Sequence, residues 1–413
     1  MRLSAFLFSK TMPKFWVITC LINFLIATML GLVLRYAFIG EIDFNFRFLT
    51  HAHSHVAMLG WLYLMLYSFI VYRFLPNIRK IYHYLFFITQ FAVIGMLFSF
   101  PFQGYAAFSI IFSSLHIFAS YFFVKLILKD LKPFTTIDKQ FIRAALWFMV
   151  ISTIGIWCLP ISIVVFGKNS DAYNIAIQTF LHFQFNGWFI FGVIGLFIKY
   201  LTSHPTEKKT QLKKALGWLI LSVVFTLALP ISWFVKLPTL NIINSLGVIF
   251  QLIGFYHLIV ALKKPLNTFL SSATLYIKSL VYFILISMVI KVLFQSFSVF
   301  PEVNEASIQI RNLVIGFIHL LMLGVISGAL LLFLSLEGIF NHNKLFARIG
   351  LGLFILGFVL SEIYLFLQGG MYYLNLGELP LYHKSLLVFS SFIGGGVFLF
   401  LLSVLLMNKN QNL

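Results

Sequence analysis

Twelve apolar runs, each about 20 residues long, constrain this chain more than any other feature of its sequence. A run of that length crosses the hydrocarbon core of a bilayer as a helix. With 61% hydrophobic and 10% charged residues, the chain has too little polar surface for a water-soluble fold. We therefore predict an all-α integral membrane protein that contacts the lipid bilayer. The cores of its twelve transmembrane helices are expected near 15–34, 53–72, 84–101, 105–124, 144–166, 176–198, 215–235, 244–262, 276–297, 312–334, 349–367 and 385–406.

Lysine and arginine are distributed unevenly between the two sides of this topology. The N-terminal segment, every second loop and the C-terminal tail contain 22 of the 29 Lys and Arg residues. The opposite loops contain six, namely Arg35, Arg47, Lys168, Lys236, Arg311 and Lys384. Because cytoplasmic loops are enriched in Lys and Arg, we predict that both termini are cytoplasmic. The net charge of +18 follows from this topology and favours an anionic leaflet as partner rather than nucleic acid.

The cysteine and glycine patterns exclude several kinds of chemistry. Cys20 and Cys158 both fall within predicted helices and have no CxxC spacing. This pattern excludes a disulfide scaffold, a thiolate metal site and a covalently attached c-type haem. The sequence also has no glycine-rich phosphate-binding loop, so nucleotide-driven chemistry is not expected.

A histidine motif recurs three times, always four predicted helices apart. Its copies are His55–Trp61 (HVAMLGW), His182–Trp188 (HFQFNGW) and His319–Val325 (HLLMLGV), in the second, sixth and tenth predicted helices. Each copy has a glycine five residues after the histidine, and two copies have a tryptophan next to that glycine. The recurrence predicts a single transmembrane domain over 1–413 that contains three pseudo-repeats of four helices. Their bounds are expected near 1–133, 134–264 and 265–413.

The three motif histidines share one predicted depth, below the outer ends of their helices. An ionisable group within a span is costly, so it usually serves as a ligand, a relay or a partnered polar group. Neutral imidazole is the usual axial ligand of haem and also binds copper or zinc. The motif glycine lies about one and a half α-helical turns further on, where a macrocycle or another helix could approach. For His116, His257 and His383 the pattern favours hydrogen-bonded packing instead.

Twelve helices with histidines near the outer ends of helices two, six and ten resemble subunit I of the haem-copper oxidase superfamily. The segments His53–Trp61 and Tyr72–Pro76 are similar to the second-helix region of nitric oxide reductase-like proteins. They are also similar to that region of NnrS, a smaller twelve-helix relative. His182, together with Asn186 and Gly187, resembles the sixth-helix copper-ligand region of nitric oxide reductase.

This resemblance implies a ligand set for a b-type haem. His55, or alternatively His53, and His319 would be the two axial ligands of a low-spin haem b. His182 would bind a second metal, copper or another ion. Arg47 would pair with a haem propionate, because arginine forms bidentate pairs with carboxylates. The implied role is respiratory electron transfer, or nitric oxide or oxygen handling, beside other respiratory-chain subunits or a cytochrome in the bacterial cytoplasmic membrane.

The chain departs from the family's pattern at the second metal site. No adjacent histidines occur within 215–262, and position 317 is Phe where the family has a histidine. The ligand of the high-spin haem and two of the three copper ligands therefore have no counterpart. The sequence predicts one haem, and it leaves open whether the protein is an oxidoreductase enzyme, with no catalytic residue assigned.

Two other function classes fit parts of the sequence. A secondary transporter would also have twelve spans and internal repeats. Its candidate polar groups are Lys291 and Gln295, one turn apart on one face of the ninth helix, and Glu362 of the eleventh, a candidate partner of Lys291. A haem-free assembly or metal-delivery protein could use His51, His53 and His55 as a metal site. In a regular helix, however, His51 and His55 share one face and His53 points away, unless the helix starts only after His53.

Overall fold

The computed structural model describes residues 11–201, 208–340 and 344–406, which form helices and their connections with no strand. The predicted helix count is confirmed, since twelve helices in the described residues are long and apolar enough to span a membrane. These spans are Lys14–Tyr36, Phe46–Phe74, Lys80–Gln103, Ala107–Asp130, Ile137–Phe166, Asp171–Leu201, Lys209–Ser232, Pro238–Ser272, Leu275–Phe297, Arg311–Leu336, Leu345–Tyr373 and Tyr382–Leu405.

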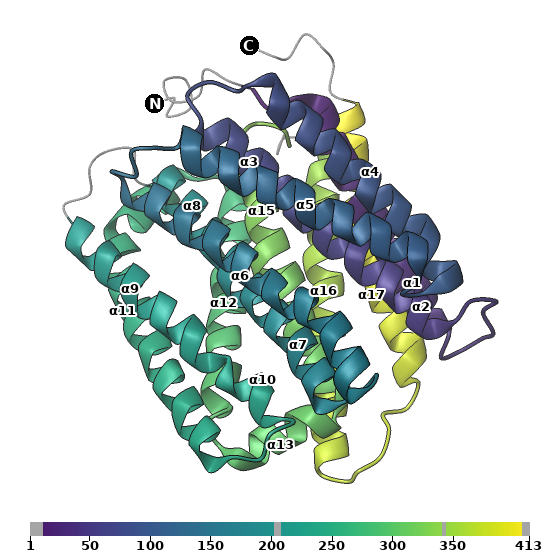
Figure 1. Ribbon diagram of the computed structural model, residues 1–413. Helices are drawn as coiled ribbons and strands as arrows, with labels where there is room; N and C mark the ends of the chain where they lie inside the picture. The colour runs from purple at the N-terminus through teal and green to yellow at the C-terminus, as the bar shows by residue number, and fades with distance from the viewer. Residues whose placement is uncertain (1–10, 202–207, 341–343, 407–413) are drawn as a thin grey trace. The chain divides into compact units, whose positions relative to one another are not determined.

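Several spans consist of more than one helical element (Figure 1). The second, sixth and tenth spans each contain a π-helical segment, labelled η, between two α-helices. In chain order the elements are α1(Lys14–Tyr36), α2(Phe46–His55), η1(Val56–Tyr63), α3(Leu64–Phe74), α4(Lys80–Gln103), α5(Ala107–Asp130), α6(Ile137–Phe166), α7(Asp171–His182), η2(Phe183–Phe189), α8(Ile190–Leu201), α9(Lys209–Thr226), α10(Ala228–Ser232), α11(Pro238–Ser272), α12(Leu275–Phe297), α13(Pro301–Gln309), α14(Arg311–His319), η3(Leu320–Ser327), α15(Gly328–Leu336), α16(Leu345–Tyr373) and α17(Tyr382–Leu405).

The described residues divide into two compact units. Unit 1 consists of the described residues within Met1–Ile127, Ser279–Phe283 and Ser327–Leu413. Unit 2 consists of those within Leu128–Lys278 and Ile284–Ile326. In unit 1, α1 packs against α2, η1 and α17, and α16 packs against α17. In unit 2, α6 packs against α7, η2 and α8, and α9 lies along α11.

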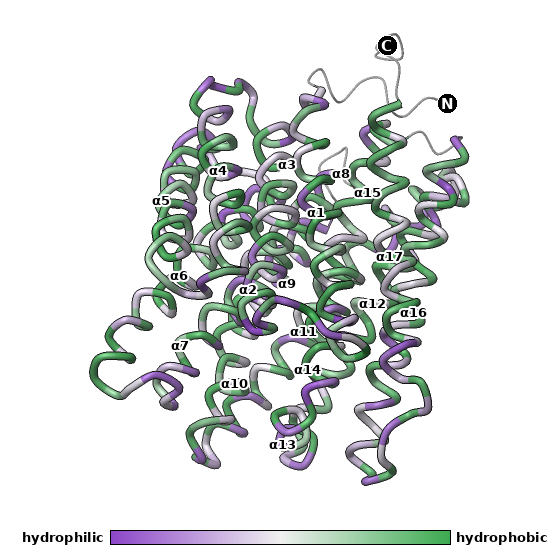
Figure 2. The backbone as a smooth tube through the Cα atoms, turned by 90° about the vertical axis from the view of Figure 1, so that its right-hand side faces the viewer, coloured by the Kyte–Doolittle hydropathy of each residue, from purple (hydrophilic) through white to green (hydrophobic). Residues whose placement is uncertain are grey.

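The three spans with the histidine motif are the most buried of the twelve. About three quarters of the residues in their apolar cores are buried, 78% in the second and sixth spans and 72% in the tenth, against 33–44% in the others. Most of the other spans therefore leave apolar side chains for lipid to cover. In Figure 2 hydrophobic colouring runs along these helices, whereas the short α13 is largely hydrophilic.

Side-chain caps fix where two of the motif-bearing spans begin. The Asn45 side-chain oxygen accepts hydrogen bonds from the backbone N–H groups of Arg47 (3.0 Å) and Phe48 (3.2 Å) at the start of α2. The Ser170 hydroxyl accepts from the Tyr173 N–H at 3.3 Å at the start of α7. Both caps satisfy N–H groups that have no partner within the helix. They define the first turns of the helices that end at His55 and His182.

A buried ion pair joins the far ends of two motif-bearing spans within unit 1. The sequence predicts that Arg73 lies in one of the loops rich in Lys and Arg. In the structure it is instead the penultimate residue of α3 and only 7% exposed. Its guanidinium contacts the carboxylate of Glu337, which directly follows α15. Removing two charges from water is costly unless they are paired, so this contact accounts for the burial of Arg73.

Candidate functional site

Each motif histidine is the last residue of an α-helix and directly precedes a π-helical segment. His55 ends α2 before η1, His182 ends α7 before η2, and His319 ends α14 before η3. A π-helix bonds each backbone N–H to the carbonyl five residues earlier, which is also the spacing from histidine to glycine in the motif. The glycine thus lies one π turn from the histidine, not the one and a half turns expected for an α-helix.

The motif glycines let neighbouring helices approach closely. A Cβ atom on Gly60 would lie 2.9 Å from Val93 Cγ1 and 3.0 Å from Asn23 Cβ. On Gly187 it would lie 2.5 Å from Phe148 Cβ. The sequence left open whether a macrocycle or another helix approaches each glycine, and at these two positions the structure has another helix.

An amide pair secures η1 at Gly60. Asn23 Nδ2 donates to the Gly60 carbonyl at 2.9 Å and to Gln90 Oε1 at 2.7 Å. Gln90 Nε2 donates back to Asn23 Oδ1 at 3.2 Å. Sequence reasoning missed this pair, although two amide side chains within apolar spans were a usable signal. A buried polar network that is satisfied in this way favours one arrangement of α1, η1 and α4.

His53 and His55 differ in how many of their ring nitrogens form hydrogen bonds. His53 Nδ1–H donates to the Ala27 carbonyl of α1 at 2.9 Å, and its ring packs beside Gly31. Among the described residues, His53 Nε2 has no hydrogen-bond partner. His55 Nδ1–H donates to the His51 carbonyl at 2.8 Å, and its Nε2 accepts from the Tyr105 hydroxyl at 3.1 Å. Of these two histidines, His53 therefore keeps a nitrogen lone pair that is not engaged by a described neighbour.

His51 and Arg47 lie nearer the start of α2. The His51 ring packs edge-on against Tyr105, with ring centroids 4.8 Å apart. Arg47 is exposed in the first turn of the helix. In residues 11–201, 208–340 and 344–406, no three His, Cys, Asp or Glu side chains form a group that could hold a metal ion. The rings of His51 and His55 both pack against Tyr105, whereas His53 bonds to α1, as the helical spacing predicted.

His182 is buried in unit 2, and one of its ring nitrogens is anchored. Its Nε2–H donates to the Val223 carbonyl of α9 at 2.8 Å, which leaves Nδ1 with no hydrogen-bond partner in the part of the chain that is described. Asn186, one turn further on, donates weakly to the His182 carbonyl at 3.5 Å. His319 is half-buried at the start of η3.

A second polar cluster lies in unit 2 around Lys291. Lys291 is only 4% exposed, and its ammonium group donates to Gln295 Oε1, as their spacing on one helical face predicted. Further along, Ser298 Oγ donates to the Gln295 carbonyl at 2.7 Å, and Asn244 Nδ2 donates to Ser298 Oγ at 3.2 Å. The sequence did not reveal Asn244, because it joins the cluster only through tertiary packing, 54 residues away from Ser298 along the chain.

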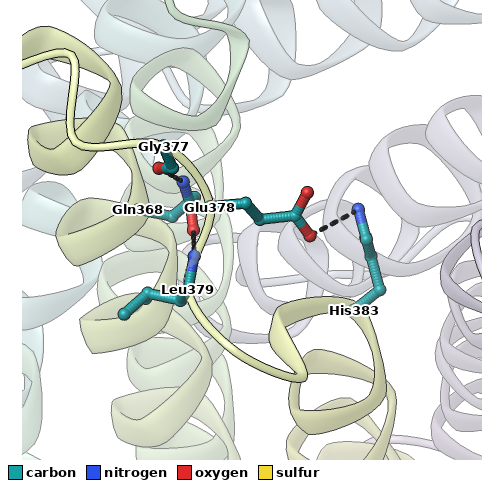
Figure 3. A network of polar contacts seen from close by, with 5 residues as sticks. All are labelled: Gln368, Gly377, Glu378, Leu379 and His383. Atoms are coloured by element: carbon teal, nitrogen blue, oxygen red, sulfur yellow. Dashed lines mark hydrogen bonds and ion pairs between the residues drawn. The ribbon is translucent and has the colours of Figure 1, made fainter.

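For three further histidines the sequence favoured hydrogen-bonded packing, and all three have described neighbours. His257 Nδ1 is 2.6 Å from Gln211 Oε1. The ring of the buried His116 packs edge-on against Tyr63, with ring centroids 4.7 Å apart, but its Nε2 has no hydrogen-bond partner among the described residues. His383 Nε2 is 3.4 Å from Glu378 Oε1 in the connection between α16 and α17 (Figure 3). Gln368 of α16 holds this connection, because it donates to the Gly377 carbonyl at 2.9 Å and accepts from the Leu379 N–H at 2.7 Å.

Comparison with known proteins adds no family to this description, because no family model and no curated protein matches the chain.

Proposed function

We propose that the chain binds one b-type haem in the manner of the haem-copper oxidase superfamily, with His53 as one axial ligand and His319 as the second ligand that the resemblance implies. The observation that carries this proposal is the anchored ring of His53, whose Nδ1–H donates to the Ala27 carbonyl. Metal-ligating imidazoles are typically held through their second nitrogen in this way, which fixes the tautomer and directs the other nitrogen at the metal. His55 is the weaker alternative, because both of its nitrogens are engaged.

We also propose that the chain consists of three repeats of four helices and that both termini are cytoplasmic. Its support is the placement of a π segment directly after each of His55, His182 and His319. Segments of this kind are rare and frequently mark functional sites. The burial of these three spans, about twice that of the others, also favours equivalent positions in three repeats.

The proposal is for a single haem and not for a complete oxidase centre. The small residues Ala27 and Gly31 face the His53 ring, and Arg47 at the start of the same helix is the proposed propionate partner. His182, with Nδ1 unengaged among the described residues, is the proposed ligand of copper or another metal. The sequence offers no paired histidines for a full binuclear site, so we propose no catalytic residue.

A haem with two axial imidazoles exchanges one electron and offers no open position to a gas. Electron transfer is therefore the proposed role of the haem ligated by His53 and His319, with another respiratory subunit or a cytochrome as donor in the bacterial cytoplasmic membrane. Nitric oxide or oxygen would need a metal with an open position, and within this proposal that metal would be bound at His182.

The test is a reduced-minus-oxidised absorption spectrum of the protein purified from haem-replete cells. We expect a sharp α-band and a pyridine haemochrome value of about one haem b per chain, as one bis-histidine site implies. His53→Ala and His319→Ala are each expected to abolish the six-coordinate spectrum. His55→Ala should retain it, because His55 is not a proposed ligand.

His257→Ala is the matched control, since it removes an imidazole that hydrogen-bonds to Gln211. A colourless wild-type preparation would overturn the proposal. So would a six-coordinate spectrum that survives His53→Ala and His319→Ala in folded protein. Loss of the six-coordinate spectrum in His55→Ala but not in His53→Ala would show that His55, and not His53, is the axial ligand.

A secondary transporter is the second candidate function, and the buried Lys291 cluster favours it. Lys291 donates to the Gln295 side chain, and Ser298 links the Gln295 backbone carbonyl to Asn244 of α11. Intramembrane ionisable groups of this kind often mark ion pathways. A colourless protein with proton flux across proteoliposomes that Lys291→Met abolishes would favour the transporter over the haem protein.

A further inference from the structure

An open groove lies at one end of the α9–α11 helix pair. It is lined by Lys208, Val260, Lys263, Lys264, Asn267 and Thr268. The two helices run side by side in Figure 1, and the groove includes the residue just before α9 and the last third of α11. Nothing in the proposed haem site uses these residues.

The groove carries three positive charges and no carboxylate among its lining residues. Lys208 Nζ donates to the Val260 carbonyl at 3.0 Å, which holds this ammonium group over α11. Lys263 and Lys264 are exposed, and within the described ranges neither forms a hydrogen bond or an ion pair through its side chain. Three cations with unused donors around one groove suit a phosphate group.

An exposed apolar stripe on α11 leads to this groove. The stripe consists of Ile249, Leu252, Tyr256 and Ile259, which are 50%, 47%, 63% and 62% exposed in the structure. At 3.6 residues per turn, these four positions and Lys263 fall within an arc of about 80° on the helix. The stripe is about 15 Å long at 1.5 Å per residue, which is comparable to much of an acyl chain.

We propose that this surface is a binding site for one anionic glycerophospholipid. The phosphate would bind Lys208, Lys263 and Lys264, and the acyl chains would lie along the α11 stripe. Basic pockets beside spanning helices bind anionic head groups, and each nearby lysine contributes about 1 kcal/mol, or roughly fivefold in affinity. A free phosphate ion shares the head-group chemistry but would gain nothing from the stripe.

The test measures lipid binding to the full-length protein in detergent by native mass spectrometry. Phosphatidylglycerol and phosphatidylcholine with the same acyl chains are compared, and we expect phosphatidylglycerol to bind about tenfold tighter or better. The triple variant Lys208→Gln, Lys263→Gln and Lys264→Gln should lose that preference. The double variant Tyr256→Ser and Ile259→Ser should weaken the binding of both lipids.

The matched control is Lys125→Gln, Lys129→Gln and Lys132→Gln, which removes the same charge from exposed lysines on and after α5. This control should keep the preference for phosphatidylglycerol. Equal binding of both lipids to the wild type, or an unchanged preference in the groove variant, would refute the proposal. Displacement of phosphatidylglycerol by millimolar inorganic phosphate would also refute it, because the site would then bind a soluble phosphate.

Discussion

Trp61 Nε1 donates a hydrogen bond of 2.9 Å to Ser327 Oγ, and this bond joins two of the three motif-bearing spans within unit 1. Trp61 lies in η1 beside the motif glycine, and Ser327 is the last residue of η3. Both side chains are buried, and the Trp61 ring also stacks on Phe24 of α1, with ring centroids 4.5 Å apart. The motif tryptophan thus connects one π segment to another.

Replacing Trp61 by Phe should destabilise the protein by removing this hydrogen bond while keeping much of the stacking on Phe24. A buried hydrogen bond contributes about 1 kcal/mol, and an unsatisfied Ser327 hydroxyl adds a similar cost. SDS unfolding of Trp61→Phe, Ser327→Ala and the double variant measures the coupling between the two side chains. Strictly additive losses would show that the bond contributes nothing.

Breaking the buried Arg73–Glu337 pair should be among the most destabilising changes at the protein's polar positions. Arg73→Met or Glu337→Gln leaves one charge buried without its partner, at a cost of about 3–5 kcal/mol. The double variant Arg73→Met and Glu337→Leu should recover most of that loss, because both charges are gone.

The control for this pair is Lys199–Asp138, whose charged atoms are 3.7 Å apart and whose side chains are 29% and 13% exposed. Lys199→Met should change the free energy of unfolding by about 1 kcal/mol or less. Equal losses at Arg73 and Lys199 would contradict the role assigned to burial.

Adding a methyl group at Gly187 should destabilise the contact between η2 and α6. The new Cβ would lie 2.5 Å from Phe148 Cβ, so the two helices would have to separate. Overpacking of this kind costs about 1–3 kcal/mol. Thermal unfolding in detergent should show a lower midpoint for Gly187→Ala.

Gly217 in α9 is the matched control for Gly187, because no described atom of a neighbouring residue lies within 4 Å of the position that a Cβ would take there. Gly217→Ala should be neutral or stabilising by up to about 1 kcal/mol, since alanine favours the helical backbone. A loss of stability as large as that of Gly187→Ala would count against the close-packing explanation.

Replacing Lys291 by Met should raise stability, because the buried ammonium group donates only to the neutral Gln295 among the described residues. A lysine at the centre of a span costs about 2.5–3.5 kcal/mol, and methionine of similar length removes that cost. The unfolding midpoint in SDS measures the gain.

Lys278, near the start of the same helix, provides the comparison for Lys291. Lys278→Met is expected to change stability by about 0.5 kcal/mol or less, as is usual for peripheral positions. A destabilised Lys291→Met would mean that the ammonium group is paired with a negative charge. A stabilised but inactive variant would assign Lys291 to function.

The sequence alone was sufficient for the twelve spans and for the three histidine motifs. A spanning helix satisfies its own backbone hydrogen bonds, so its presence depends on a continuous local run of apolar residues. The spacing of five from histidine to glycine was visible too. The π-helical type of the segment after each histidine was not visible, because an α-helix and a π-helix differ in the register of their backbone hydrogen bonds. Neighbouring helices that pack against Gly60 and Gly187 contribute to the choice between the two helix types.

Tertiary structure decided which of two neighbouring histidines keeps an unengaged nitrogen. His53 and His55 are two residues apart and chemically identical, and the sequence could not separate them as ligands. The distinction comes from Ala27 on α1 and from Tyr105 between α4 and α5, which lie 26 and 50 residues away along the chain. The burial of Arg73 against Glu337 likewise depends on the packing of helices that are distant along the chain. Local hydrophobicity determines which segments enter the membrane, whereas the partners of polar side chains depend on which distant helices pack against them.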